Sequence, residues 1–139
     1  MGHVTPEPLA EFLRDELGDS LRSVIHYSIA VDERGEPTLD HDLVYVREDV
    51  DAAYSDEERQ DVVRDLGLES FGKEFQERLY DHGELNSIVR CFEGAIEMHF
   101  IVSEGEGVAV AMEPETFVAE RTFIGRCMEK AGVPPEGGE

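Results

Sequence analysis

The spacing of apolar residues predicts a helix at the start of the chain and a strand soon after it. Thr5 followed by Pro6 is typical of an N-cap and a first helical position. The apolar residues that follow lie on one helical face as far as Gly18: Leu9, Phe12, Leu13 and Leu17. From residue 23 to residue 31 the period changes to two, which predicts a strand with an apolar side: Ile25, Tyr27, Ile29 and Val31. A polar connection over 32–42 leads to a second, shorter strand over 43–47.

The middle of the chain has the pattern of two consecutive helical segments. Ser55 and Glu58 have the spacing of a capping box, in which each side chain bonds the backbone N–H of the other residue. The first segment has a buried stripe of Val62, Val63 and Leu66. We expect Gly67 to interrupt it. The second segment has apolar residues at i, i+4 and i+8, namely Phe71, Phe75 and Leu79.

Three strands and a helix are predicted for the rest of the chain. The strands cover Leu85–Phe92, Ala95–Ser103 and Val108–Met112, and glycine-containing turns at 93–94 and 104–107 join them as hairpins. A last helix is expected to run from near Pro114 to a cap at Gly132. We therefore expect a single domain over residues 1–133 and a disordered tail over 134–139.

The first of these hairpins has a register that follows from its two-residue turn. Arg90 lies opposite Glu97, and Ile88 lies opposite His99. One face must then belong to the core: Val89, Cys91, Ile96, Met98 and Phe100. The other face mixes apolar and charged residues: Ile88, Phe92, Ile101, Arg90, Glu97 and His99. We expect a terminal helix or a partner molecule to cover this second face.

Arg90, Glu97 and His99 are the candidate binding residues, because the register places all three on one face of neighbouring strands. One interpretation is a cross-strand ion pair with a surface histidine beside it, which would stabilise the fold by at most about 1 kcal/mol. The other is a recognition patch for an anionic ligand or for a peptide of a partner protein.

The order of elements resembles that of the roadblock and longin domains and, equally, that of the PAS domains. This resemblance covers nearly the whole chain. It implies an α+β fold with a central five-stranded antiparallel sheet in the profilin-like order 2-1-5-4-3, flanked by helices. Two short segments, Tyr45-Val46-Arg47 and Phe92-Glu93, also resemble uncharacterised acidic proteins of halophilic archaea.

The charge of the chain points to its solvent. There are 33 acidic residues against 12 basic ones, for a net charge of -21, and only two of the basic residues are lysines. In salt of about 1 M the Debye length is about 3 Å, so such a surface is screened and stays hydrated. The composition therefore predicts a cytoplasmic protein of a halophile, and no apolar stretch is long enough to suggest a membrane span.

Three features of the sequence suggest specific chemistry, and a physical argument counts against each. The segment 67–73 matches the GxxxxGK core of a phosphate-binding loop, but Glu74 stands where that loop needs Ser or Thr. The run 40–42 has Asp, His and Asp, but three consecutive residues rarely converge on one metal ion. Cys91 and Cys127 are expected to be reduced core thiols. We expect no catalytic residue, metal or cofactor, and the dispersed basic residues predict no binding of nucleic acid.

The function expected from these observations is that of a small non-catalytic interaction or regulatory module. Two alternatives stay open: a PAS-like sensor of small molecules, and an enzyme that uses an unrecognised carboxylate or cysteine. We also expect a homodimer, formed through the edge strand 85–92 or the central helix, and a protein partner is compatible with this function. The expected interface is a sheet face that carries Ile88, Phe92, Ile101, Val108, Val110 and Met112.

Overall fold

The computed structural model describes residues 6–119 and 121–133. The helices are α1 (Pro6–Leu17), α2 (Glu48–Ala53), α3 (Asp56–Phe71), α4 (Lys73–Tyr80), α5 (Glu115–Val118) and α6 (Phe123–Lys130). The strands are β1 (Leu21–Val31), β2 (Pro37–Val46), β3 (Ser87–Cys91), β4 (Ile96–Ser103) and β5 (Glu106–Met112). A 3₁₀ turn over Gly18–Ser20 joins α1 to β1. The predicted N-cap at Thr5 and the predicted disordered tail over 134–139 lie outside the described residues.

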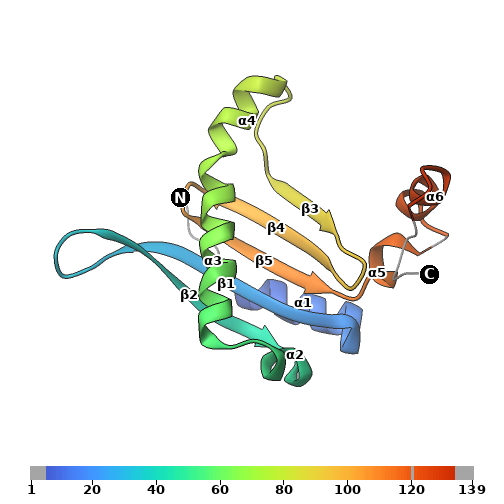
Figure 1. Ribbon diagram of the computed structural model, residues 1–139, viewed down its shortest axis with the longest axis horizontal. Helices are drawn as coiled ribbons and strands as arrows, with labels where there is room; N and C mark the ends of the chain where they lie inside the picture. Colours follow the sequence, from blue (N-terminus) through green and yellow to red (C-terminus); the bar gives the residue numbers. More distant parts are fainter. Residues whose placement is uncertain (1–5, 120, 134–139) are drawn as a thin grey trace.

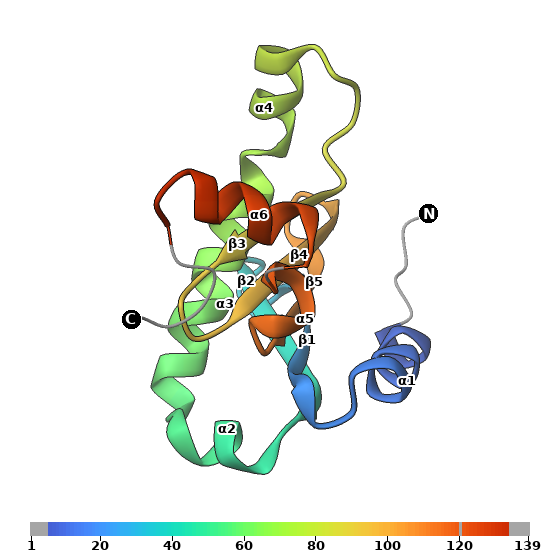
Figure 2. The same cartoon turned by 90° about the vertical axis from the view of Figure 1, so that its right-hand side faces the viewer.

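The strands form one antiparallel sheet of five strands in the order β2-β1-β5-β4-β3, which confirms the expected α+β fold and strand order. The register predicted for the β3–β4 hairpin is also confirmed, with Arg90 opposite Glu97 and Ile88 opposite His99. Helix α3 crosses one face of the sheet and α1 lies on the other, so the molecule has three layers (Figures 1 and 2). Both faces of the sheet are therefore covered by helices of the same chain.

The larger core lies between the sheet and α1. Helix α1 contributes Ala10 and Leu13, and the strands contribute Leu21, Val24, Ile96, Val108, Val110 and Met112. Phe12, predicted on the buried side of this helix, is 58% exposed. Val89 and Cys91, which were predicted in the core, are also exposed because β3 is the edge of the sheet.

The proposed grouping of residues on the opposite face was wrong for β5. The β4–β5 register pairs Met98 with Val110 and Phe100 with Val108. These two valines and Met112 therefore share the face of α1, whereas Ile88 and His99 share the face of α3. The two sets of apolar residues do not form one continuous surface, because the sheet lies between them.

The face of α3 is covered by a helix from the middle of the chain rather than by a terminal one. Val63 and Leu66 of α3 pack with Tyr27 and Ala109 of the sheet. The capping box of Ser55 and Glu58 is present at the start of α3. The expected interruption at residue 67 was wrong, because α3 continues to Phe71.

Two further expectations about element boundaries were wrong. Strand β2 begins at Pro37, so residues 37–42 of the predicted polar connection belong to this strand and pair with β1 in a long hairpin. The last helix is divided into α5 and α6. Residue 125 at the start of α6 lies against the carbonyl oxygen of Ala119, where any Cβ would collide. Only glycine permits this close approach.

Candidate functional site

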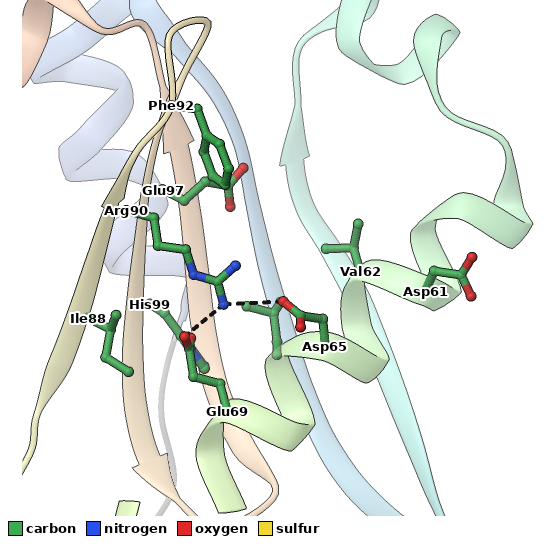
Figure 3. Close-up of a pocket in the computed structure, with 10 residues that line it drawn as sticks. Asp61, Val62, Asp65, Glu69, Ile88, Arg90, Phe92, Glu97 and His99 are labelled. Atoms are coloured by element: carbon green, nitrogen blue, oxygen red, sulfur yellow. Dashed lines mark hydrogen bonds and ion pairs between the residues drawn. The ribbon is translucent and has the colours of Figure 1, made fainter. Parts of the chain in front are cut away.

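An open groove of about 270 Å³ lies between α3 and the β3–β4 hairpin. We call it the α3 groove. It contains all three residues predicted from the sequence, and its full lining is Asp61, Val62, Asp65, Leu66, Glu69, Ile88, Arg90, Phe92, Glu97 and His99. Figure 3 shows Arg90 directed toward Glu69 and Asp65 of α3, while Phe92 and Glu97 lie near the β3–β4 turn.

His99 is buried rather than at the surface, with 3% of its area exposed. Its Nε2 lies 2.6 Å from the hydroxyl oxygen of Tyr27, and its Nδ1 lies 2.6 Å from Oε1 of Glu69. Since the carboxylate only accepts, Nδ1 carries the proton and donates to Glu69, and Nε2 accepts from Tyr27. The imidazole thus joins the sheet to α3.

The surroundings of this chain of hydrogen bonds hold its groups in their uncharged forms, apart from Glu69. Burial lowers the pKa of His99 and outweighs the opposing effect of Glu69. Burial also raises the pKa of Tyr27 to about 12. Burial opposes ionisation of Glu69, but hydrogen bonds from His99 and Arg90 outweigh it and lower the pKa of this carboxyl. Because Tyr27 has no exposed surface, its hydroxyl cannot meet a substrate.

Arg90 binds α3 and not its cross-strand neighbour. Its Nη2 donates to Oε2 of Glu69 at 2.7 Å and to Oδ2 of Asp65 at 3.2 Å. The predicted ion pair with Glu97 is not formed, although the two residues are opposite each other in the register. Arg90 of β3 and His99 of β4 therefore share Glu69, which connects both strands to the helix through two hydrogen bonds.

Glu97 differs from the other charged residues of the groove. Its side chain forms no hydrogen bond or ion pair with any residue that the structure describes, and it is only partly exposed. Burial raises its pKa and outweighs the attraction of the Arg90 and Arg22 guanidinium groups, neither of which bonds this carboxylate. Glu97 also lines a second cavity of about 90 Å³ that lies toward β1, β2 and α2. Among the acidic residues that line the α3 groove, Glu97 is the one that forms no hydrogen bond or ion pair with a described residue, since Asp61 pairs with Arg64, and Asp65 and Glu69 pair with Arg90.

The lining around this carboxyl group limits what the groove can hold. Phe92 lies near Glu97, and Val62 and Ile88 supply apolar surface elsewhere in the groove. Within the described ranges 6–119 and 121–133, no group of three His, Cys, Asp or Glu residues could hold a metal ion. The arrangement suits an organic group with an apolar body and a charged donor.

Sequence reasoning found Arg90, Glu97 and His99 but missed the residues of α3 and β1 that hold them. Asp65 and Glu69 are four residues apart, so they share one side of a helix, and this spacing was the available signal. Tyr27 was predicted on the apolar side of its strand, and its hydrogen bond with His99 was not foreseen. Which strands α3 crosses depends on contacts distant in sequence, and the spacing of residues does not determine that.

The motifs that were set aside occupy ordinary secondary structure. The 67–73 segment is the end of α3 and the start of α4, so it forms no phosphate-binding loop. The Asp-His-Asp run lies in β2, where successive side chains point to opposite faces. Cys91 and Cys127 are exposed and free, contrary to their predicted burial.

The comparison with protein families gives one result. A family model described as a domain of unknown function (DUF7522) matches residues 7–132. No curated protein and no solved structure matches the chain. Among the helices of the described residues, none has the length and apolar character needed to cross a membrane.

Proposed function

The chain belongs to the DUF7522 family, whose function is unknown, and we propose that it is a non-catalytic interaction module that binds a basic side chain of a partner protein in the α3 groove. The observation that carries this proposal is the unpartnered, partly buried carboxyl group of Glu97 near Phe92, in a groove whose apolar lining also includes Ile88 and Val62. An arginine or lysine side chain has both an apolar stem and a donor for this carboxylate.

The acidity of the whole chain makes the position of Glu97 informative. In molar salt, exposed carboxylates attract a cation only weakly, because charges more than about 3 Å apart are screened. A partly buried carboxylate is screened much less. In the cytoplasm of a halophile, where we propose that this protein works, Glu97 can select a cation while the exposed acids keep the protein hydrated.

An anionic ligand is not favoured. Arg90 is the basic residue of the groove, and it already donates to both Glu69 and Asp65. Binding an anion there would require breaking these charge-assisted hydrogen bonds and bringing a negative charge close to two carboxylates.

The two other functions expected from the sequence receive less support. A PAS-like sensor needs an enclosed pocket of roughly 300 Å³ or more for a drug-sized ligand, whereas this groove is open and holds about 270 Å³. An enzyme needs polar groups that can reach a substrate. The alternative was an enzyme that uses a carboxylate or a cysteine. Burial raises the pKa of the Cys91 thiol, which disfavours its reactive thiolate, and His99 and Tyr27 are buried and bonded to each other, so they cannot assist a carboxylate.

A nuclear magnetic resonance titration tests the proposed function. The acetylated and amidated peptide Leu-Arg-Leu is added to the protein in 2–3 M KCl, and Leu-Gln-Leu serves as the matched control. We expect the arginine peptide to shift the signals of Val62, Ile88 and Phe92 at lower concentration than the glutamine peptide. Equal shifts for the two peptides, or no shifts at these residues, would contradict the proposal.

We further propose that the protein is a homodimer at micromolar concentration. Exposed apolar residues on α3 and α4 support this proposal. The sheet face that the sequence analysis expected at the interface does not support it, because its residues are divided between the two sides of the sheet, which α1 and α3 cover.

A further inference from the structure

Helices α3 and α4 carry a row of exposed apolar side chains that we call the α4 stripe: Leu68, Phe71, Phe75 and Leu79. Their exposed fractions are 68%, 46%, 54% and 59%. Spacings of three, four and four residues place them on one side of a helix. That side is opposite the one by which Leu66 and Ser70 are buried against the sheet. The stripe is therefore a continuous apolar surface that faces solvent.

Phe71 borders an open pocket with Ile29 and Leu39 of the β1–β2 hairpin, whereas no other element of the described residues covers the part of the stripe on α4. Helix α4 continues from α3 and projects past the sheet in both views (Figures 1 and 2). It buries none of its residues. Gly72, between the two helices, has φ -85° and ψ -2°, and its N–H donates to the carbonyl oxygen of Glu69, three residues earlier. The apolar row therefore runs over a break in the helix, from Leu68 and Phe71 on α3 to Phe75 and Leu79 on α4.

The charge of this part of the chain differs from that of the whole. Residues 71–80 contain two basic residues, Lys73 and Arg78, and two acidic ones, Glu74 and Glu77, whereas the chain has a net charge of -21. In molar salt two acidic copies repel each other only where their charges come close together, as they do within a contact surface. A contact through a neutral segment avoids this repulsion.

We propose that the α4 stripe is a two-fold interface between two copies of this chain, with their α4 helices antiparallel and crossing near Gln76. At a rise of 1.5 Å per residue, this crossing interleaves Phe71, Phe75 and Leu79 of one copy with the same residues of the other. It also places Glu74 of each copy level with Arg78 of the second copy, on the same flank of the contact. The surface is thus complementary to itself, as a two-fold interface requires.

The size of the stripe sets the strength expected of the dimer. The three interleaved side chains from each copy, with their neighbours, would bury roughly 800–1,000 Å² in total, which is below the size of a standard specific interface and typical of a weak one. We therefore expect a dimer that dissociates in the micromolar range. This inference rests on the proposed homodimer and names its surface.

Sedimentation equilibrium in 2 M KCl at about 1–100 μM tests the interface. We expect the wild type to be a dimer and Phe75→Asp to be a monomer, with a dissociation constant raised by about 100-fold or more because each dimer loses two buried rings. The control is Phe12→Asp, which changes an exposed phenylalanine on α1 and should leave the dimer intact. Circular dichroism verifies that both variants are folded.

A charge exchange provides a second test that does not alter the apolar row. Arg78→Glu and Glu74→Arg should each weaken the dimer, since each places like charges opposite one another, and the double variant should restore it. The pair within one helix is highly exposed and 3.9 Å apart, so its loss should change stability little.

The outcomes separate the two proposals. A monomeric wild type would overturn both the homodimer and its interface. If the wild type is a dimer, and neither Phe75→Asp nor the single charge variants weaken it, the interface alone is overturned and the homodimer stands.

Discussion

Glu97 and His99 are two residues apart on β4, but only the histidine has hydrogen-bond partners in its buried surroundings. His99 has a hydrogen-bond partner for each ring nitrogen and is neutral in the folded protein. Glu97 loses water without gaining a hydrogen bond, and the attraction of Arg90 and Arg22 does not offset this loss, so Glu97 destabilises the fold when it is ionised. A group that reduces stability in this way is typical of a binding site, where the ligand supplies the missing contact.

Replacing Glu97 with glutamine should stabilise the free protein at pH 7.5 by roughly 0.5–1 kcal/mol, because it removes a partly buried charge and keeps the shape. The raised pKa of Glu97 means that the penalty is present above that pKa and vanishes as the pH falls toward the ordinary value of 4.5. Chemical denaturation at several pH values measures the difference. A variant that is less stable than the wild type at pH 7.5 would show that Glu97 has a stabilising partner.

Replacing His99 with glutamine should change the pH dependence of stability. The lowered pKa of His99 means that the unfolded chain takes up a proton below the ordinary value of 6.5 while the folded protein does not. The wild type should therefore lose stability as the pH falls from about 6.5 toward the folded pKa, and His99→Gln should lack this component. Parallel stability curves for the two proteins between pH 7 and pH 5 would contradict the assignment of a neutral histidine.

At the scale of elements, local features of the sequence were predicted and distant packing was not. The Glu93-Gly94 turn fixes the β3–β4 register, and the capping box fixes the start of α3, because both depend on neighbouring residues. Gly67 was expected to stop α3, but the helix tolerates it and the methyl groups of Leu39 fill the space beside it. The burial of His99 depends on α3 and β1, which are far away in sequence, and for that reason the sequence could not show it.

The contact between β1 and β5 gives a prediction at this scale. A Cβ at Gly107 would lie 2.7 Å from both the hydroxyl oxygen of Tyr27 and the carbonyl oxygen of Phe100. Gly107→Ala should therefore displace Tyr27 from His99 and destabilise the protein by about 1–3 kcal/mol. The matched control is Gly94→Ala, where nothing lies within 4 Å and a change of less than about 0.5 kcal/mol is expected. Thermal unfolding of the two variants makes the comparison, and equal stabilities would contradict this packing.

At the scale of the whole molecule, the net charge of -21 opposes the compact state unless salt screens it. Lowering KCl from 2 M to about 0.1 M lengthens the Debye length from a few ångströms to about 10 Å. We expect the protein to unfold or expand over this range, which far-ultraviolet circular dichroism detects. An unchanged spectrum and melting temperature in 0.1 M KCl would contradict the proposed adaptation to salt.

The central claim is that Glu97 recognises a basic side chain in the α3 groove. The most direct measurement is a thermodynamic cycle in 2–3 M KCl, with calorimetric affinities of wild type and Glu97→Gln for the Leu-Arg-Leu and Leu-Gln-Leu peptides. We predict that the wild type prefers the arginine peptide by about 10-fold, equivalent to about 1.4 kcal/mol, and that Glu97→Gln loses this preference while it remains folded. The same preference in both proteins would contradict the claim.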